Sequence, residues 1–120
     1  MKAFKSTMTI LALVTLACFS ASAFAKGNPS AGQSKAAVCE ACHGKDGKTS
    51  LDPSYPILAG QYSSYLAKAL QDYRSGKRTN AIMAPMASGL SDQDIEDLAA
   101  WYSSQEGLYD LSIKQAATRN

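Results

Sequence analysis

The stretch that decides the fold is CEACH, residues 39–43, which contains the only histidine of the chain, His43, and two of its three cysteines, Cys39 and Cys42. Cysteines three positions apart lie on the same face of a helix, so both thiols can add to the two vinyl groups of one porphyrin. The histidine that follows directly then projects its imidazole toward the iron. Because C-x-x-C-H is the attachment signature of c-type haem, the sequence predicts one covalent haem at these residues.

Three other chemistries of the same residues are weaker explanations. An exported cysteine pair meets an oxidising compartment and can form a disulfide, and a C-x-x-C pair can act as a thioredoxin-like redox centre. Neither explains His43, and no alternating strand–helix pattern surrounds the motif. A zinc site fails because two cysteines and one adjacent histidine are too few ligands to close a tetrahedron. Haem attachment is the interpretation that uses all three side chains.

Residues 1–25 have the pattern of an export signal. Lys2 and Lys5 precede a short apolar run, and an Ala-x-Ala pattern ends at Ala25. The run is shorter than the about 20 apolar residues that span a bilayer, so we expect cleavage after Ala25 rather than an uncleaved membrane anchor. This predicts a mature domain over residues 26–120, a periplasmic location and no stable membrane insertion after cleavage.

The composition indicates one small globular domain. The chain has 120 residues, of which 46% are hydrophobic and 18% charged, a balance typical of folded proteins. Its formal charge of +2 includes Lys2 and Lys5 of the expected signal, so the mature domain is close to neutral. This argues against binding to nucleic acid. A domain of this size commonly needs a disulfide, metal or cofactor to complete its core.

A haem that carries electrons without binding substrate needs a second axial ligand, and the chain has no second histidine. Met83 and Met86 are the soft candidates, in a Pro-containing loop predicted over residues 80–86, about 40 residues after His43. Ligation by His and Met raises the reduction potential of the iron. Either methionine can instead fill the small core, which is the commoner use of this residue. The residues alone leave both assignments open.

The remaining sequence predicts helices joined by loops. Helical periodicity, together with start and stop residues, favours helices over residues 29–42, 61–75 and 91–104. Glycines and prolines predict an irregular loop over 44–60, and residues 107–120 are weakly patterned. No strand alternation stands out, so the predicted fold class is all-α.

Apolar residues at helical spacing predict which faces of two helices are buried. In the second predicted helix they are Tyr62, Tyr65, Leu66, Ala69, Leu70 and Tyr73. The third predicted helix begins with the capping-box pair Ser91 and Asp94. Its apolar face comprises Ile95, Leu98, Ala99 and Tyr102, with Trp101 beside it.

Four stretches, in this order and spacing, resemble a known family: CEACHGKDG (39–47), YPILAGQ (55–61), YRSGKR (73–78) and MAPMASGLSDQDIEDLAAWY (83–102). The sequence resembles the class I c-type cytochromes of the small periplasmic bacterial kind, and is similar to one half of the dihaem periplasmic cytochromes. The resemblance covers nearly all of residues 26–105, and only one haem motif is present. It implies an all-α, single small cytochrome c fold with helices wrapped around one covalent haem c.

The resemblance also implies roles for particular residues. The two motif cysteines bond the haem and the motif histidine is its proximal iron ligand. The carbonyl of Pro56 accepts the imidazole N–H, which fixes the tautomer of the ring. The interval between the ligand methionine and the last helix favours Met83 as the other axial ligand, with Met86 as the alternative and otherwise as core packing. The first helix would cross the last one at small residues such as Gly32 or Ala36.

With both axial positions filled by protein, the resemblance implies a periplasmic one-electron carrier and not an enzyme. Redox proteins are its expected donors and acceptors, in transient contacts, and we expect a monomer. A peroxidase needs an open iron position and a nearby acid–base group, and the chain has no second histidine for that role. The alternative is a haem-bearing electron-transfer subunit, or a ligand sensor, within a larger complex.

Overall fold

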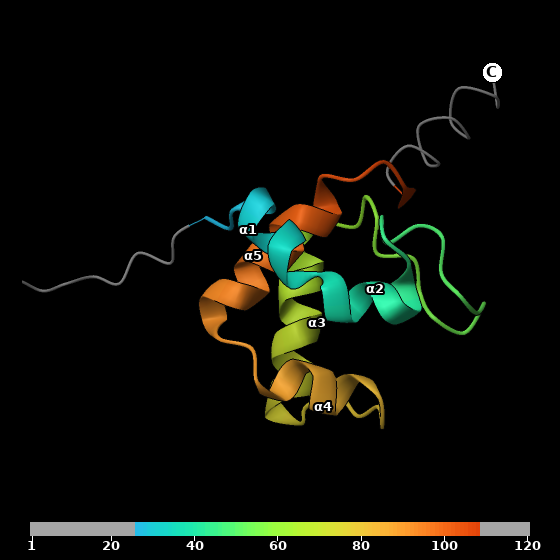
Figure 1. Ribbon diagram of the computed structural model, residues 1–120. Helices are drawn as coiled ribbons and strands as arrows, with labels where there is room; N and C mark the ends of the chain where they lie inside the picture. The colour runs from blue at the N-terminus through green and yellow to red at the C-terminus, as the bar shows by residue number, and fades with distance from the viewer. Residues whose placement is uncertain (1–25, 109–120) are drawn as a thin grey trace, which may run out of the picture.

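Helices and the loops between them make up residues 26–108, the part of the chain that this computed structural model describes. The helices are α1 (Pro29–Lys35), α2 (Ala37–His43), α3 (Ser63–Ser75), α4 (Met83–Ser88) and α5 (Asp92–Ser103) (Figure 1). No strand occurs within residues 26–108, in agreement with the predicted all-α class. The expected signal peptide, 1–25, and residues 109–120 of the expected tail lie outside the described residues.

The first predicted helix is present as two short helices, α1 and α2, joined at Ala36. Pro29 lies in the first turn of α1, where its missing N–H costs nothing, and the Asn28 side chain caps this turn by accepting two backbone hydrogen bonds. The Ala36 N–H donates to Gln33 O, three residues back, so the chain tightens before α2 begins. α2 then ends at Gly44, whose φ of 81° glycine adopts without strain.

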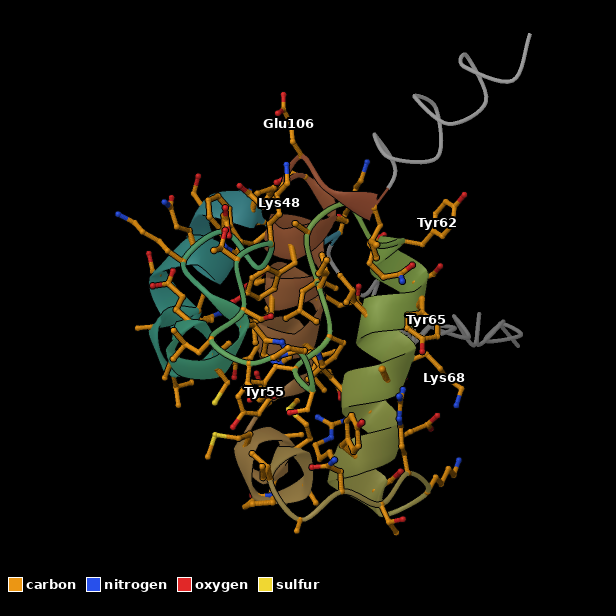
Figure 2. All side chains as sticks on the ribbon, turned by 90° about the vertical axis from the view of Figure 1, so that its right-hand side faces the viewer. Lys48, Tyr55, Tyr62, Tyr65, Lys68 and Glu106 are labelled. Carbon is orange, nitrogen blue, oxygen red and sulfur yellow. The ribbon has the colours of Figure 1, made fainter. Side chains whose placement is uncertain are left out.

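α3 confirms the second predicted helix but not its predicted face. The helix ends at Gly76 in the left-handed conformation, and it buries Leu66 and Ala67. Tyr62 and Tyr65 are 70% and 51% exposed and point away from the ribbon in Figure 2, so their predicted burial is wrong. A narrower stripe of smaller side chains brings the helices closer together, and it leaves the tyrosine hydroxyls in water.

α4 begins inside the loop predicted over residues 80–86, so that prediction is wrong for residues 83–86. The Asn80 side chain accepts hydrogen bonds from the N–H groups of Ile82 and Met83, which starts the helix. Pro85 lies in the first turn, where helical N–H groups have no intrahelical partner. A proline in this position is therefore compatible with a short helix.

α5 confirms the predicted start of the last helix. The Ser91 hydroxyl accepts a hydrogen bond from the Asp94 N–H, and the Asp94 carboxylate accepts one from the Ser91 N–H, which forms the predicted capping box. α5 crosses α1 at Gly32, where a Cβ atom would lie 2.0 Å from the Asp97 carbonyl oxygen and 2.7 Å from Trp101 Cβ. Only glycine admits so close an approach of two backbones, so the predicted crossing at a small residue is confirmed.

The buried core lies where α1, α3 and α5 meet (Figure 1). It consists of Ala36, Leu66, Ala67, Ile95, Leu98, Ala99 and Tyr102. The irregular loop over residues 44–60 is tied to one end of this core, because Gly60 N–H donates to the Tyr102 carbonyl and Leu108 N–H to the Ala59 carbonyl, each at 2.9 Å. Within the described residues, no helix has the length and apolar character needed to cross a membrane.

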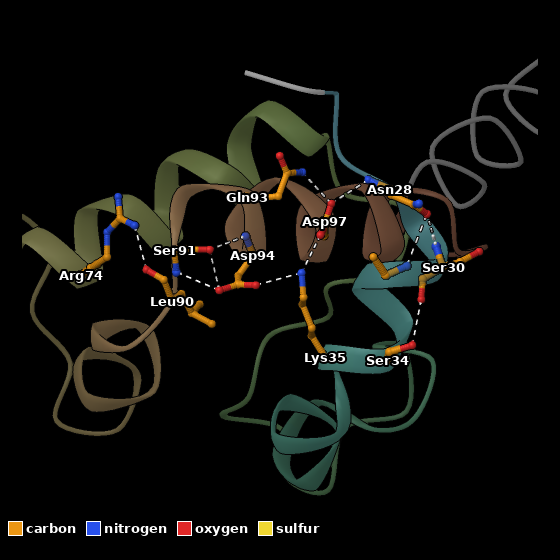
Figure 3. A network of polar contacts seen from close by, with 11 residues as sticks. Asn28, Ser30, Ser34, Lys35, Arg74, Leu90, Ser91, Gln93, Asp94 and Asp97 are labelled. Carbon is orange, nitrogen blue, oxygen red and sulfur yellow. Dashed lines mark hydrogen bonds and ion pairs between the residues drawn. The ribbon is translucent and has the colours of Figure 1, made fainter. Parts of the chain in front are cut away.

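Charged and polar side chains hold α1 against α5 (Figure 3). Lys35 Nζ lies 2.6 Å from Asp97 Oδ2 and 2.8 Å from Asp94 Oδ1. The Asn28 N–H and the Gln93 side-chain amide both donate to Asp97 Oδ1, so this buried carboxylate is well satisfied. Hydrogen bonds from Asn28 and Lys35 lower the pKa of Asp97, and the one from Lys35 lowers the pKa of Asp94. The network depends on both carboxyl groups being ionised.

Candidate haem-attachment site

Cys39, Cys42 and His43 are brought together by α2, which ends at the histidine. Both cysteines are half-buried free thiols, and no disulfide joins them. Helical spacing puts the two sulfurs on one face, as attachment to a single flat ring requires. Burial raises the pKa of the Cys39 thiol, whereas a thioredoxin-like centre relies on a lowered one. The geometry therefore favours neither the disulfide nor the thioredoxin-like alternative.

His43 is the buried centre of the site, with 5% of its surface exposed. Its Nδ1 lies 2.8 Å from the carbonyl oxygen of Pro56, the contact that the resemblance implies. Because a carbonyl oxygen can only accept, Nδ1 carries the proton, and the lone pair of the neutral ring is on Nε2. The Tyr55 ring meets the imidazole edge-on, with centroids 6.2 Å apart. The tautomer and the orientation of the ring are both fixed before any ligand binds.

Met83 and Met86 lie on a separate helix, α4, which packs against α3 and not against α2. Met83 is half-buried, and its N–H is held by Asn80. Met86 is 45% exposed and lies outside the buried core cluster. α4 thus carries two thioether side chains of unequal exposure.

The site has an apolar surround and too few donors for a bare metal ion. Four large apolar side chains that flank the candidate residues in the sequence are more than one-third exposed: Val38, Ile57, Ile82 and Met86. Apolar surface of this kind marks ligand or partner sites. Within residues 26–108, no group of three His, Cys, Asp or Glu side chains gathers to bind a metal. Two thiols and one oriented imidazole, with exposed apolar side chains near them in the sequence, fit a haem and do not fit a zinc ion.

Tyr102 is the residue that the sequence analysis missed. The sequence predicts only an apolar contact, but the structure also buries the hydroxyl, which has no hydrogen-bond partner within residues 26–108. Trp101 Nε1 is likewise buried without a partner. The available signal was a tyrosine, rather than a phenylalanine, on the buried face of a helix.

Comparisons with known proteins identify the fold. The Cytochrome c family model matches residues 30–106. Cytochrome c-554(548) from Halomonas halodenitrificans is 52% identical over 83 residues, which cover 67% of this chain and 99% of that relative. Cytochrome c4 from Pseudomonas aeruginosa is 50% identical over 84 residues, or 70% of this chain and 41% of that relative.

A solved structure agrees with the sequence matches. The crystal structure of reduced recombinant cytochrome c4 from Pseudomonas stutzeri matches with a TM-score of 0.64 and 48% identity, over 68% of this chain and 47% of that one. The chain therefore spans nearly all of one relative but less than half of the cytochrome c4 proteins.

The family match includes the CEACH motif and most of the α1–α5 crossing. Proteins of this kind have the all-α cytochrome c fold, bind haem c covalently, and pass electrons between redox partners without being enzymes. Haem c is accordingly the cofactor of this chain. The chain belongs to the cytochrome c family and is an electron-transfer haem protein.

Proposed function

We propose that Cys39 and Cys42 attach one haem c through two thioether bonds, and that His43 is an axial ligand of its iron. The observation that carries this proposal is the state of His43, a buried imidazole whose Nδ1–H already bonds to a carbonyl, beside two free thiols. Each thioether forms when a thiol adds across one vinyl group, with sulfur on one carbon and hydrogen on the other. The addition therefore needs no oxidant.

Pro56 has an electronic role as well as a positional one in this proposal. Its carbonyl accepts the Nδ1–H of His43 at 2.8 Å. A hydrogen bond of this kind fixes the ring of a histidine ligand and makes its other nitrogen a better donor. Tyr55, edge-on to the same ring, limits how far the imidazole can rotate.

Met83 is the proposed second axial ligand. It begins α4, its N–H is fixed by Asn80, and it is less exposed than Met86. A thioether sulfur opposite an imidazole favours the ferrous state. Met86, three residues further along the same helix, is the alternative ligand.

Electron transfer follows from this ligand set. The bound haem supplies one-electron exchange between the ferric and ferrous states. In this proposal His43 and Met83 would supply both protein ligands of the iron in both oxidation states, so that substrates would not reach it. This is the behaviour of a carrier with transient redox partners, since electron-transfer contacts are small.

The proposed carrier is monomeric and works in the periplasm. Lys2, Lys5 and the Ala-x-Ala pattern ending at Ala25 support export and cleavage before Lys26. The near-neutral mature domain suits brief contacts with redox proteins and not binding to nucleic acid. Mass spectrometry of the purified protein should give a chain that begins at Lys26 and carries the mass of one haem.

Extraction with acid and organic solvent tests the attachment. The haem of the wild-type protein should stay on the polypeptide. Cys42→Ser should leave a single thioether and Cys39→Ser Cys42→Ser none, so the double variant should yield little folded protein, because a domain this small depends on its cofactor. Ser64→Ala, an exposed change on α3, is the matched control and should behave like the wild type. Free haem in the organic layer from the wild-type protein would contradict the proposal.

A further inference from the structure

The short helix α4 buries very little surface of its own. Among its residues only Ala87 is fully buried, while Met83 and Ala84 are half-buried. A helix of this length is not stable by itself in water, and one buried alanine contributes little apolar area. Polar contacts must therefore help to hold α4 at both ends. The Asn80 side chain, which accepts two backbone hydrogen bonds, supplies them at its start.

Arg74 supplies the polar contacts beyond the other end of α4. It lies in the last turn of α3. Its Nη1 donates to the carbonyl oxygen of Leu90 at 2.8 Å (Figure 3), and its Nη2 donates to the carboxylate of Asp92. Leu90 lies in the link from α4 to α5, and Asp92 is the first residue of α5. One guanidinium thus joins the end of α3 to the point where the α4 segment returns.

Two neighbouring cations make contacts of another kind. Arg78, in the same YRSGKR stretch, lies over the ring of Tyr73, 4.8 Å from its centroid. Lys68 pairs with Asp72, one turn further along α3. An exposed ion pair within one helix contributes little to stability. A guanidinium with two charge-assisted hydrogen bonds to another segment is a stronger and more directional contact.

We propose that Arg74 is a positioning residue that keeps the iron-binding methionine in place, by fixing the end of the segment that carries α4. The inference rests on the proposed methionine ligation, and it holds for Met83 and Met86 because both lie on α4. The contact between Arg74 and Leu90 spans 16 positions of the chain and closes this segment into a loop. Segments with little buried surface open locally more often than the core. Arg74 makes such openings, which would withdraw the methionine sulfur from the iron, less frequent.

Displacement of the methionine by imidazole in the ferric holoprotein tests the inference. Imidazole binds the iron after the thioether has left, so the rate at saturating imidazole, followed by loss of the His–Met charge-transfer band, measures the opening. Arg74→Met removes both hydrogen bonds and keeps an unbranched side chain. We expect about fivefold faster displacement, which corresponds to about 1 kcal/mol. Lys68→Met, which removes an ion pair within α3, is the matched control and should leave the rate unchanged.

Amide hydrogen exchange, measured by NMR on the same holoproteins, shows whether the Arg74 contact breaks when α4 opens. The N–H groups of α4 should exchange about fivefold faster in Arg74→Met than in the wild type, under conditions where global unfolding is too rare to contribute. If Arg74 only stabilised the folded chain as a whole, the α4 amides would keep their wild-type rates. That outcome would overturn the inference, and so would an unchanged rate of methionine displacement.

The proposed ligation can fail separately from the role of Arg74. A wild-type holoprotein without the charge-transfer band would contradict methionine ligation itself. Hydrogen exchange of the α4 amides would still show whether Arg74 holds the segment, so the two failures are distinguishable.

Discussion

The α1–α5 crossing and the haem-attachment site are built in opposite ways. At the crossing the chain fills its own space, since Gly32 lets two backbones touch and Leu98 is almost fully buried. Val38, next to Cys39 in the sequence, stays 55% exposed, and Met86 on α4 stays 45% exposed. The polypeptide alone completes the first region. In the second region, exposed apolar side chains are left that the proposed haem would cover.

This difference gives each region its own sensitivity. The crossing depends on shape and on the ionised network around Lys35, whereas the attachment site depends on ligand chemistry at Cys39, Cys42 and His43. Changes at the crossing should lower stability and leave the haem spectrum alone. Changes of ligand at the site should alter the spectrum first.

The largest effect on stability is expected from Gly32→Val. Its side chain would overlap the Asp97 carbonyl and Trp101, so the helices must separate. The expected loss is about 3 kcal/mol of the free energy of unfolding, or more, at the upper end of overpacking. Denaturant unfolding of the purified holoprotein, followed by circular dichroism, measures it.

Gly89→Ala is the matched control for that change. A Cβ atom at Gly89 meets nothing within 4 Å, and the backbone there has an ordinary φ of −91°. The free energy of unfolding should change by no more than about 0.5 kcal/mol. Equal stability of Gly32→Val and Gly89→Ala would show that the crossing does not limit the fold.

A smaller loss is expected from Lys35→Met, which keeps the length of the side chain and removes its charge. Asp97 then remains buried with only the donors from Asn28 and Gln93. Thermal unfolding at pH 7 should start at a lower temperature than in the wild type, but above that of Gly32→Val. An unchanged unfolding temperature would mean that Lys35 contributes nothing to the crossing.

The pH dependence of the same variant sharpens the test. The pKa values of Asp94 and Asp97 are lower in the folded chain than the ordinary value near 4. Their contribution to stability is therefore fully present above about pH 4, and it is lost as the pH falls and protons bind. Because Lys35 is a cause of both shifts, the pKa values of Asp94 and Asp97 should return toward their ordinary value in Lys35→Met. The stability of this variant should therefore fall less steeply between pH 5 and pH 2 than that of the wild type. Parallel curves would contradict this.

The smallest effect on stability is expected from Met86→Leu, a volume-conserving change that should cost less than about 1.5 kcal/mol. It should also keep the weak charge-transfer band of ferric haem with His and Met ligands.

Met83→Leu should abolish that band, lower the potential and allow carbon monoxide to bind the ferrous form. The reverse pattern would move the ligand assignment to Met86. Carbon monoxide binding by the unmodified protein at neutral pH would indicate a ligand sensor.

Much of the fold could be predicted because local signals agree with tertiary packing. The capping box at Ser91 and Asp94 and the end of α3 at Gly76 are each determined by residues only a few positions apart. Gly32 was a candidate for the crossing because only small residues let helices approach. The contact between His43 and Pro56, 13 residues apart, is present in the structure.

The remainder depends on choices that a pattern leaves open. Tyr62 and Tyr65 fit a helical stripe, but their size and their hydroxyls suit solvent as well as a core. Pro85 is a loop signal that is equally compatible with a first helical turn. Whether the Tyr102 hydroxyl is buried without a partner depends on how α5 packs against the rest of the core, and no spacing within one helix encodes that.

The α1–α5 crossing also limits the order in which the chain can fold. It joins the first and the last described helices, so a chain that emerges from its N-terminus cannot close until α5 has been delivered. Cys39 appears about 60 residues before Tyr102, and it packs against the core cluster that contains Tyr102. The thiol is therefore accessible while the chain is still open. If the haem is attached as proposed, the order of synthesis provides an interval for its attachment before the last helix completes the core.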